Sequence, residues 1–204
     1  MIAVVDYGVG NLFSLKSSLD YTGLQNIFTN NEEEIRNADA LILPGVGAFR
    51  DAIDILNKTG LGNVVKEEAG KGKKVLGICL GMQLLFDRSH EYGDYKGLGL
   101  IKGDVVAMKD NIENKKLKIP HMGWNSLEFF KEDEILKYIN EGEYVYYVHS
   151  YYAKNCDESV IACSDYEIKI PGIVKSNNIY GIQFHPEKSG KTGLNILKAF
   201  GEMI

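Results

Sequence analysis

The chain has 204 residues, of which 23 are Lys or Arg and 28 are Asp or Glu, so its net charge is −5 at neutral pH. This length is enough to bury a full hydrophobic core, and we expect residues 1–204 to form one domain. The acidic balance and the lack of a basic tract argue against a nucleic-acid-binding protein. Apolar runs are too short to cross a membrane and the N-terminus lacks a basic leader, so we expect a soluble cytoplasmic protein.

The first half of the sequence alternates between short apolar strands and amphipathic helices. Asn11 is placed to cap a helix that carries Leu12, Leu15 and Leu19 on one face. The other predicted helical segments are Glu32–Arg36, Ala48–Leu56, Val64–Ala69 and Met82–Asp87. The predicted strands are Ile2–Tyr7, Asn26–Thr29, Ala40–Leu43 and Lys74–Ile78. This order predicts an α/β fold with a doubly wound, mostly parallel sheet and helices on both faces.

Three glycine-rich segments follow predicted strands, at residues 8–10, 44–47 and 77–81. Ligands of doubly wound sheets bind beyond the carboxyl ends of the strands, so we expect these loops to converge on one edge. A phosphate-binding loop is the alternative for residues 8–10, but no third glycine follows at the required spacing.

The second half is richer in predicted strands, and Asn177-Asn178 is a plausible two-residue hairpin turn between the last two. The predicted strands are Asp104–Met108, Ser126–Phe130, Glu143–His149, Ser159–Cys163, Gly172–Ser176 and Ile179–Phe184. Glu134–Ile139 and Thr192–Met203 are predicted helices. The tyrosine-rich stretch 144–152 is best explained by sheet packing, with a binding surface as the alternative.

Cys79 has the sequence surroundings of a nucleophile. It stands in Gly-x-Cys-x-Gly between a predicted strand and a helix, which is the Gly-x-Ser-x-Gly elbow with sulfur in place of oxygen. Side chains at Gly77 or Gly81 would collide with neighbouring backbone, and the helix N-terminus would stabilise a thiolate. The alternative is a small core residue. Cys156 and Cys163 lack this elbow and are expected to be inert free thiols, because three cysteines show no disulfide spacing.

A cysteine nucleophile needs a base and a group that orients the base. We expect His185 to be the base and Glu187 to accept its second N–H, because residues i and i+2 of an extended chain project to the same side. Pro186 would keep the pair rigid. His149 is the rival base, although no carboxylate lies two residues from it.

Acyl transfer also requires hydrogen-bond donors for an oxyanion. The backbone N–H of Leu80 is one candidate, by analogy with the serine elbow. The second would come from the peptides of Val46 or Gly47, where the flanking glycines permit close approach and rotation. The sequence has no metal-ligand spacing, and no metal or other cofactor is expected.

These motifs carry a resemblance to a known family. Residues 77–83 and 184–189 resemble the class I glutamine amidotransferases, which use a Cys-His-Glu triad. Four further segments resemble one branch of that family, the glutaminase subunits of imidazole glycerol phosphate synthases. They are Val5–Asn11, Leu43–Phe49, Pro120–Asn125 and Val148–Tyr151. The resemblance covers nearly the whole chain, in order.

The resemblance implies that Cys79 attacks the side-chain amide of glutamine and forms a γ-glutamyl thioester. His185 then protonates the leaving ammonia, and water releases glutamate. The amino-acid end of the substrate would be held by Gln83, Glu91, Ser150 and Tyr151. Such a set makes chemical sense, since an ammonium needs carboxylate or carbonyl acceptors and a carboxylate needs N–H donors. For Glu91 the alternative is a solvated surface charge.

The partner implied by the resemblance is a (β/α)₈ cyclase subunit in a heterodimer. It would receive ammonia through a channel and make imidazole glycerol phosphate and AICAR in histidine biosynthesis. The residues expected near this interface are Asn11, His121, Trp124, Tyr146 and Lys188. A resting Val46 peptide that turns inward on activation would couple glutamine hydrolysis to the acceptor.

Three other functions stay open at this point. The chain could be a glutaminase subunit for a different synthase, such as anthranilate or pyridoxal phosphate synthase. It could be a stand-alone cysteine hydrolase, for example a γ-glutamyl hydrolase, which would be active without a partner. A binding module without activity is the third alternative, and it would have no need of Cys79, His185 and Glu187 together.

Overall fold

The computed structural model describes residues 1–114 and 116–204. Its main sheet has eight strands in the order β2-β1-β3-β4-β14-β13-β12-β9. The first five run parallel and the last three pair antiparallel, which confirms the predicted α/β fold. The strands are β1 (Ile2–Val5), β2 (Asn26–Thr29), β3 (Ala40–Leu43), β4 (Lys74–Ile78), β9 (Glu128–Phe129), β12 (Val160–Tyr166), β13 (Ile168–Ser176) and β14 (Ile179–Ile182).

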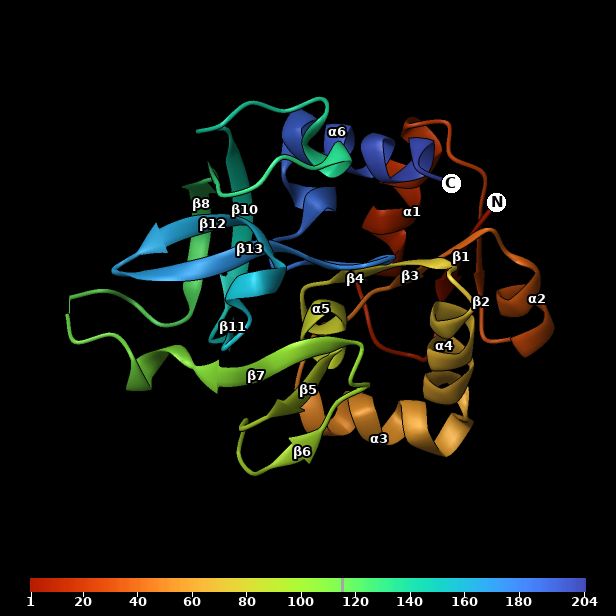
Figure 1. The fold of residues 1–204 in the computed structure, drawn as a ribbon, viewed down its shortest axis with the longest axis horizontal. Helices are drawn as coiled ribbons and strands as arrows, with labels where there is room; N and C mark the ends of the chain where they lie inside the picture. The colour runs from red at the N-terminus through yellow and green to blue at the C-terminus, as the bar shows by residue number, and fades with distance from the viewer. Residues whose placement is uncertain (115) are drawn as a thin grey trace.

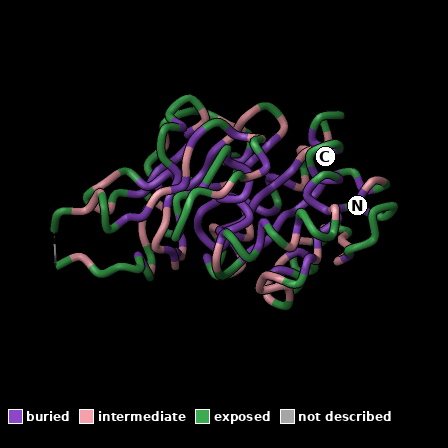
Figure 2. Tube along the Cα trace, turned by 90° about the horizontal axis from the view of Figure 1, so that it is seen from below, coloured by how far each residue is buried: buried purple, intermediate pink, exposed green. Residues whose placement is uncertain are grey.

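Helices cover both faces of this sheet (Figure 1). On one face lie α1 (Leu12–Tyr21) and α6 (Gly190–Glu202), where Leu15 and Phe200 belong to one buried apolar cluster. The other face carries α2 (Glu32–Asn37), α3 (Phe49–Thr59), α4 (Leu61–Gly70) and α5 (Leu80–Leu84). Buried residues run through the middle of the molecule and exposed ones lie on the outer loops and helix faces (Figure 2). Within the described residues, no helix has the length and apolar character needed to cross a membrane.

Two smaller sheets stand beside the carboxyl ends of the parallel strands. One pairs β8 (His121–Ser126) with β10 (Tyr144–His149), and the other has the order β11-β7-β5-β6. The strands of the second are β5 (Phe86–Ser89), β6 (Tyr95–Lys96), β7 (Ile101–Ala107) and β11 (Tyr151–Lys154). Ser150 alone separates β10 from β11, so the chain passes from one small sheet to the other at that residue.

Several sequence predictions of local structure were wrong. The helix predicted over 82–87 ends at Leu84 and Phe86 begins β5, because a fully buried apolar run has no face that distinguishes helix from strand. The helix predicted over 134–139 is only a 3₁₀ turn, η2 (Glu134–Leu136). Asn11 precedes α1 but its side chain makes no capping hydrogen bond. The remaining 3₁₀ turns are η1 (Met108–Asp110), η3 (Asp157–Ser159) and η4 (Pro186–Lys188).

The strand predicted over 126–130 covers β9 and only the last residue of β8, while β5, β6, β11 and the rest of β8 were missed. Strand β8 contains Gly123 and Asn125, which have low strand propensity, and it forms because it pairs with β10. The hairpin turn at Asn177-Asn178 is confirmed: Ser176 pairs with Ile179, and Asn177 has a φ of 53°.

Candidate active site

Cys79 occupies a strained turn between β4 and α5. Its φ of 55° and ψ of −111° lie in a region that non-glycine residues rarely adopt. A Cβ at Gly77 would approach the Gly81 carbonyl oxygen and the Met82 Cα to 2.7 Å. At Gly81 it would lie 2.7 Å from the Leu43 carbonyl carbon and closer still to its oxygen. Both glycines are therefore required by close backbone approach, as the sequence predicted.

We predict that Gly81→Ala destabilises the fold by about 3 kcal/mol or more, because the added methyl group overlaps the β3 backbone. Urea unfolding would measure the change. Gly70→Ala is the matched control, since a Cβ at that position in α4 meets nothing within 4 Å. The control should be neutral or slightly stabilising. A Gly81→Ala variant with wild-type stability would contradict the argument from close approach.

His185 reaches Cys79 because their strands are neighbours in the sheet. β14 runs parallel to β4 with Ile182 opposite Ile78, and the Cys79 N–H donates to the Ile182 carbonyl at 2.7 Å. Cys79 directly follows the carboxyl end of β4, and His185 lies three residues beyond the carboxyl end of β14. The loops at residues 8–10 and 44–47 lie at the same edge, since a Cβ at Gly10 would approach Pro44 to 3.3 Å.

Glu187 orients the imidazole, as the sequence predicted, but for a different local reason. His185 Nδ1 lies 2.8 Å from Glu187 Oε1, and both side chains are 3% exposed. Glu187 lies in η4, so the contact comes from a 3₁₀ turn and the expected extended geometry was wrong. The bond to Glu187 uses Nδ1 and leaves Nε2 for Cys79.

The charge of His185 is set by its neighbours. Burial alone would lower its pKa, but hydrogen bonds to Cys79 and Glu187 outweigh burial and raise the pKa to about 10. An imidazolium is therefore favoured beside the sulfur. Glu187 Oε2 is buried and has no hydrogen-bond partner among the described residues, which leaves the imidazolium as the principal stabilising partner of this carboxylate.

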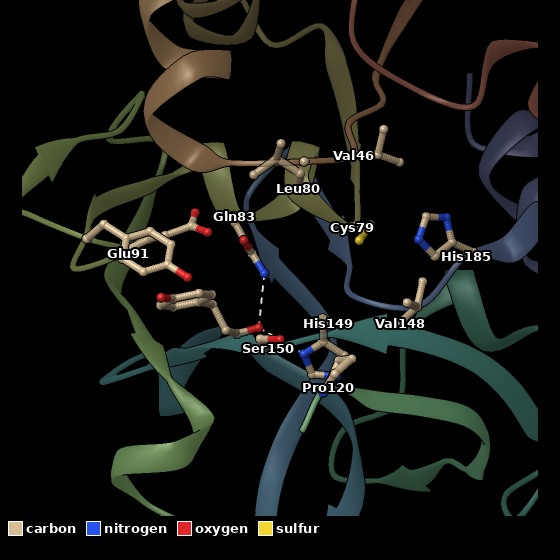
Figure 3. Close-up of a pocket in the computed structure, with 13 residues that line it drawn as sticks. Val46, Cys79, Leu80, Gln83, Glu91, Pro120, Val148, His149, Ser150 and His185 are labelled. Atoms are coloured by element: carbon tan, nitrogen blue, oxygen red, sulfur yellow. Dashed lines mark hydrogen bonds between the residues drawn. The ribbon is translucent and has the colours of Figure 1, made fainter. Parts of the chain in front are cut away.

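A cavity of about 390 Å³ opens over Cys79. It contains nearly all of the residues singled out from the sequence for catalysis, oxyanion binding and substrate binding (Figure 3). Glu187 is the exception: it does not line the cavity but contacts His185 Nδ1. The lining residues are Val46, Gly47, Cys79, Leu80, Gln83, Glu91, Tyr92, Pro120, Val148, His149, Ser150, Tyr151 and His185.

Comparison with known proteins decides the family. The family model described as "Glutamine amidotransferase class-I" matches residues 3–203. A protein of Caldanaerobacter subterraneus subsp. tengcongensis, named "Imidazole glycerol phosphate synthase subunit HisH", is 51% identical over all of this chain and 98% of its own length. A Bacillus cereus protein of the same name is 50% identical over all of this chain and 95% of its own. This chain belongs to the HisH family of class I glutamine amidotransferases.

Solved structures share the fold of this HisH-family chain at much lower identity. One described as "Crystal structure of glutamine amidotransferase" has a TM-score of 0.75 and 20% identity, and covers 98% of both chains. "Structure of PurLQS from Thermotoga maritima" has a TM-score of 0.76 and 20% identity, and covers 99% of this chain and 97% of that one. At this identity the likeness concerns the fold alone.

Two polar side chains of the cavity wall form hydrogen bonds with the protein backbone. Gln83 Nε2 donates to the Tyr151 carbonyl at 3.0 Å (Figure 3). Glu91 Oε2 accepts from the Phe49 N–H at 2.7 Å, and burial raises the pKa of this carboxyl group. Glu91 is 9% exposed, so it is not the solvated surface charge that the sequence left as an alternative.

His149 lines the same cavity, but its ring nitrogens are both engaged elsewhere. Its Nδ1 lies 2.8 Å from the Tyr151 carbonyl oxygen, and its Nε2 lies 2.9 Å from His121 Nδ1. Burial lowers the pKa of His149 to about 3, so the ring is neutral. With both ring nitrogens engaged, His149 has no free atom for Cys79, and the geometry favours His185.

Three supporting residues of this HisH-family chain were missed from the sequence. Tyr7 donates from its hydroxyl to the Pro44 carbonyl at 2.7 Å and so supports the loop 44–47. Ser189 Oγ donates to the His185 carbonyl at 2.6 Å and accepts from the Tyr146 N–H at 2.9 Å. Gln183 Nε2 lies 3.8 Å from Cys79 Sγ. A glutamine in an apolar strand two residues before His185 was an available signal for the last of these.

The residues expected at the partner interface do not all lie at the surface. Trp124 is 55% exposed and meets Tyr146 edge-on at 5.9 Å, while Lys188 Nζ lies 6.0 Å from the Tyr146 ring centre. Asn11 is partly buried at the start of α1. His121 is 3% exposed, so its side chain is not presented to a partner by the isolated subunit.

Proposed function

We propose that Cys79, His185 and Glu187 carry out glutamine hydrolysis in this HisH-family glutaminase subunit of imidazole glycerol phosphate synthase. The observation that carries the proposal is one cavity lined by both a cysteine at a strained elbow and the histidine of a buried His–Glu pair. Identity of about half over the full length to named HisH subunits favours this pathway over other glutaminase subunits and over stand-alone hydrolases.

The reaction follows from the charges of the pair. The Cys79 thiolate attacks the γ-carbonyl carbon of glutamine, and a C–S bond forms. His185 gives its proton to the amide nitrogen, the C–N bond breaks and ammonia leaves. Because acylation removes the negative sulfur that helps to raise the pKa of His185, the imidazolium becomes a stronger acid as the nitrogen departs. Water then attacks the thioester with His185 as base, and glutamate leaves as the C–S bond breaks.

Binding of the substrate is assigned to the cavity walls. We infer that Glu91 and the oxygen of Gln83 accept from the ammonium group of glutamine, while backbone groups of Ser150 and Tyr151 face its amino-acid end. The Leu80 N–H and the peptides of Val46 and Gly47 would hold the oxyanion. Gly47 has a φ of 95° and open space at its Cβ position, so rotation of the preceding peptide meets little resistance.

The partner of the subunit is a cyclase that consumes the ammonia. We infer that Trp124, Tyr146 and Lys188 contribute to the surface facing it, because exposed Trp124 and Lys188 pack against half-buried Tyr146. Tyr146 is linked to His185 through the backbone, since the His185 N–H donates to the Tyr146 carbonyl at 2.9 Å. A partner that moves the Tyr146 backbone would therefore also shift the position of His185.

Partner binding is expected to stimulate glutamate release by about 100- to 1000-fold, if it completes an oxyanion site that lacks one donor at rest. Glutamate would be measured for the subunit alone, with the cyclase, and with the cyclase and its ribonucleotide substrate. Bovine serum albumin in place of the cyclase is the control. An isolated subunit as fast as the full complex would contradict the Val46 hypothesis and would favour a stand-alone hydrolase.

A further inference from the structure

Gln183 connects the nucleophile to the opposite wall of the cavity. It follows β14 and is completely buried. Its Oε1 lies 3.1 Å from Gln83 Nε2, and its Nε2 lies 3.8 Å from Cys79 Sγ. The backbone is fixed as well, because the Gln183 N–H donates to the Gly172 carbonyl at 3.0 Å. This amide takes no part in the mechanism described above.

The orientation of the Gln183 amide follows from the chemistry of its neighbours. The Tyr151 carbonyl oxygen can only accept, so the atom of Gln83 that lies 3.0 Å from it must be the amide nitrogen. That nitrogen has a second hydrogen, and the atom of Gln183 that receives it must be the oxygen. The nitrogen of Gln183 then faces the sulfur. The Tyr151 carbonyl therefore fixes the orientation of the Gln83 and Gln183 amides, and the Gln183 N–H points at Cys79.

The Tyr151 carbonyl is itself held in place from the other side. His149 Nδ1 donates to the same oxygen at 2.8 Å, and His149 Nε2 accepts from His121 Nδ1 at 2.9 Å. His121 Nε2 lies 3.3 Å from the Asn125 amide nitrogen, which also donates to the Asp165 carbonyl at 2.8 Å. Burial lowers the pKa of His121 to about 4, so both rings are neutral and this direction of donation holds at neutral pH.

We propose that Gln183 is a positioning residue for Cys79, whose Nε2–H donates to Sγ and favours the thiolate, in an orientation that Gln83 and the Tyr151 carbonyl impose. The inference rests on the proposed role of Cys79 as the nucleophile. A donor gains far more from an anionic sulfur than from a thiol, so the contact acts on the reactive form. Because the Gln83 nitrogen is committed to the protein, only its oxygen remains to meet the substrate.

Alkylation of Cys79 by iodoacetamide tests this directly, in the complex with the cyclase. The other thiols interfere little, because burial raises the pKa of Cys156 to about 12 and that of Cys163 to about 11. In Gln183→Leu we expect alkylation at pH 7 to slow by about 10-fold, as for loss of one charge-assisted hydrogen bond. The rate–pH profile should move to higher pH, and kcat should fall by a similar factor with KM nearly unchanged.

Gln183→Glu separates the sulfur contact from the contact with Gln83. A glutamate still accepts from the Gln83 nitrogen but offers no donor to sulfur and adds a like charge, so it should alkylate more slowly than Gln183→Leu. Thr29→Val removes a buried hydroxyl of β2 that does not line the cavity, and it should leave both profiles at wild-type values. Circular dichroism and cyclase binding check that each variant is folded. If Gln183→Leu is unfolded, Gln183→Asn replaces it, because its shorter side chain moves the amide away from the sulfur.

The outcomes for Gln183 and for the proposed function are distinct. Wild-type alkylation profiles in folded Gln183→Leu and Gln183→Glu would overturn the positioning role. So would a glutamate variant that reacts as fast as wild type, since Gln183 would then serve only to hold Gln83. Glutaminase activity that survives Cys79→Ala would instead overturn the nucleophile, and alkylation of Cys79 would still report on Gln183.

Discussion

Replacing Cys79 by alanine is expected to lower glutamine hydrolysis by at least about 1000-fold, because no thioester can form. The fold should survive the change. Cys79 is 7% exposed at the floor of an open cavity, so loss of the sulfur leaves little empty volume in the core. Glutamate release would be measured in the complex with the cyclase and its ribonucleotide substrate.

Two controls make the Cys79→Ala result specific. Synthesis from added ammonium salt should proceed at the wild-type rate, because free ammonia bypasses the thioester chemistry. Cys163→Ala alters a buried cysteine of β12 that does not line the cavity, and it should hydrolyse glutamine normally. Residual hydrolysis within about 10-fold of wild type in Cys79→Ala would remove Cys79 from the mechanism.

His185→Asn is expected to lower kcat by about 100- to 10,000-fold, because the reaction loses both its base and its acid. The asparagine amide nitrogen can stand where Nδ1 stood and still donate to Glu187, so the buried carboxylate keeps a partner. What disappears is Nε2, the atom left for Cys79. Iodoacetamide alkylation at pH 7 should slow in parallel, whereas a variant with wild-type kcat would show that His185 is dispensable.

The same substitution has a signature in stability against pH. The pKa of His185 in the folded chain is about 10, above the 6.5 of an ordinary imidazole, so protonation of His185 stabilises the fold. This contribution is complete below pH 6.5 and is lost as pH rises towards 10. The stability difference between wild type and His185→Asn in urea should therefore shrink across that range, and a difference that grows with pH would contradict the raised pKa.

Several local features of the candidate site could be predicted from the sequence. Gly77 and Gly81 predicted a tight elbow at Cys79, and both are needed where the structure has them. His185 and Glu187 were paired correctly because they are close in the chain, although the 3₁₀ turn that joins them was not foreseen. The four strands predicted in the first half were located within a few residues, since β1, β3 and β4 are short, buried apolar runs.

The sequence was less informative where the same residue pattern is compatible with both a helix and a strand, or where a strand depends on its pairing partner. The run from Leu84 to Phe86 is buried on every side, so neither helical nor strand periodicity could be read from it. Strand β8 carries polar and glycine residues and depends on its pairing with β10. The sequence could not show that His121, far from His149 in the chain but opposite it in the small sheet, occupies the second ring nitrogen of this rival base.

What the sequence predicted by itself is a candidate nucleophile, the pairing of its candidate base with Glu187 and the glycines of the elbow, because local turn geometry and side-chain reach act between residues close in the chain. Only the tertiary structure decided that β14 lies beside β4, which brings His185 to Cys79. It alone showed that Tyr151, Gln83 and Gln183 form one line of hydrogen bonds to the sulfur. Such contacts depend on strand order and on the direction in which each amide donates, and these are fixed by packing between segments far apart in the chain.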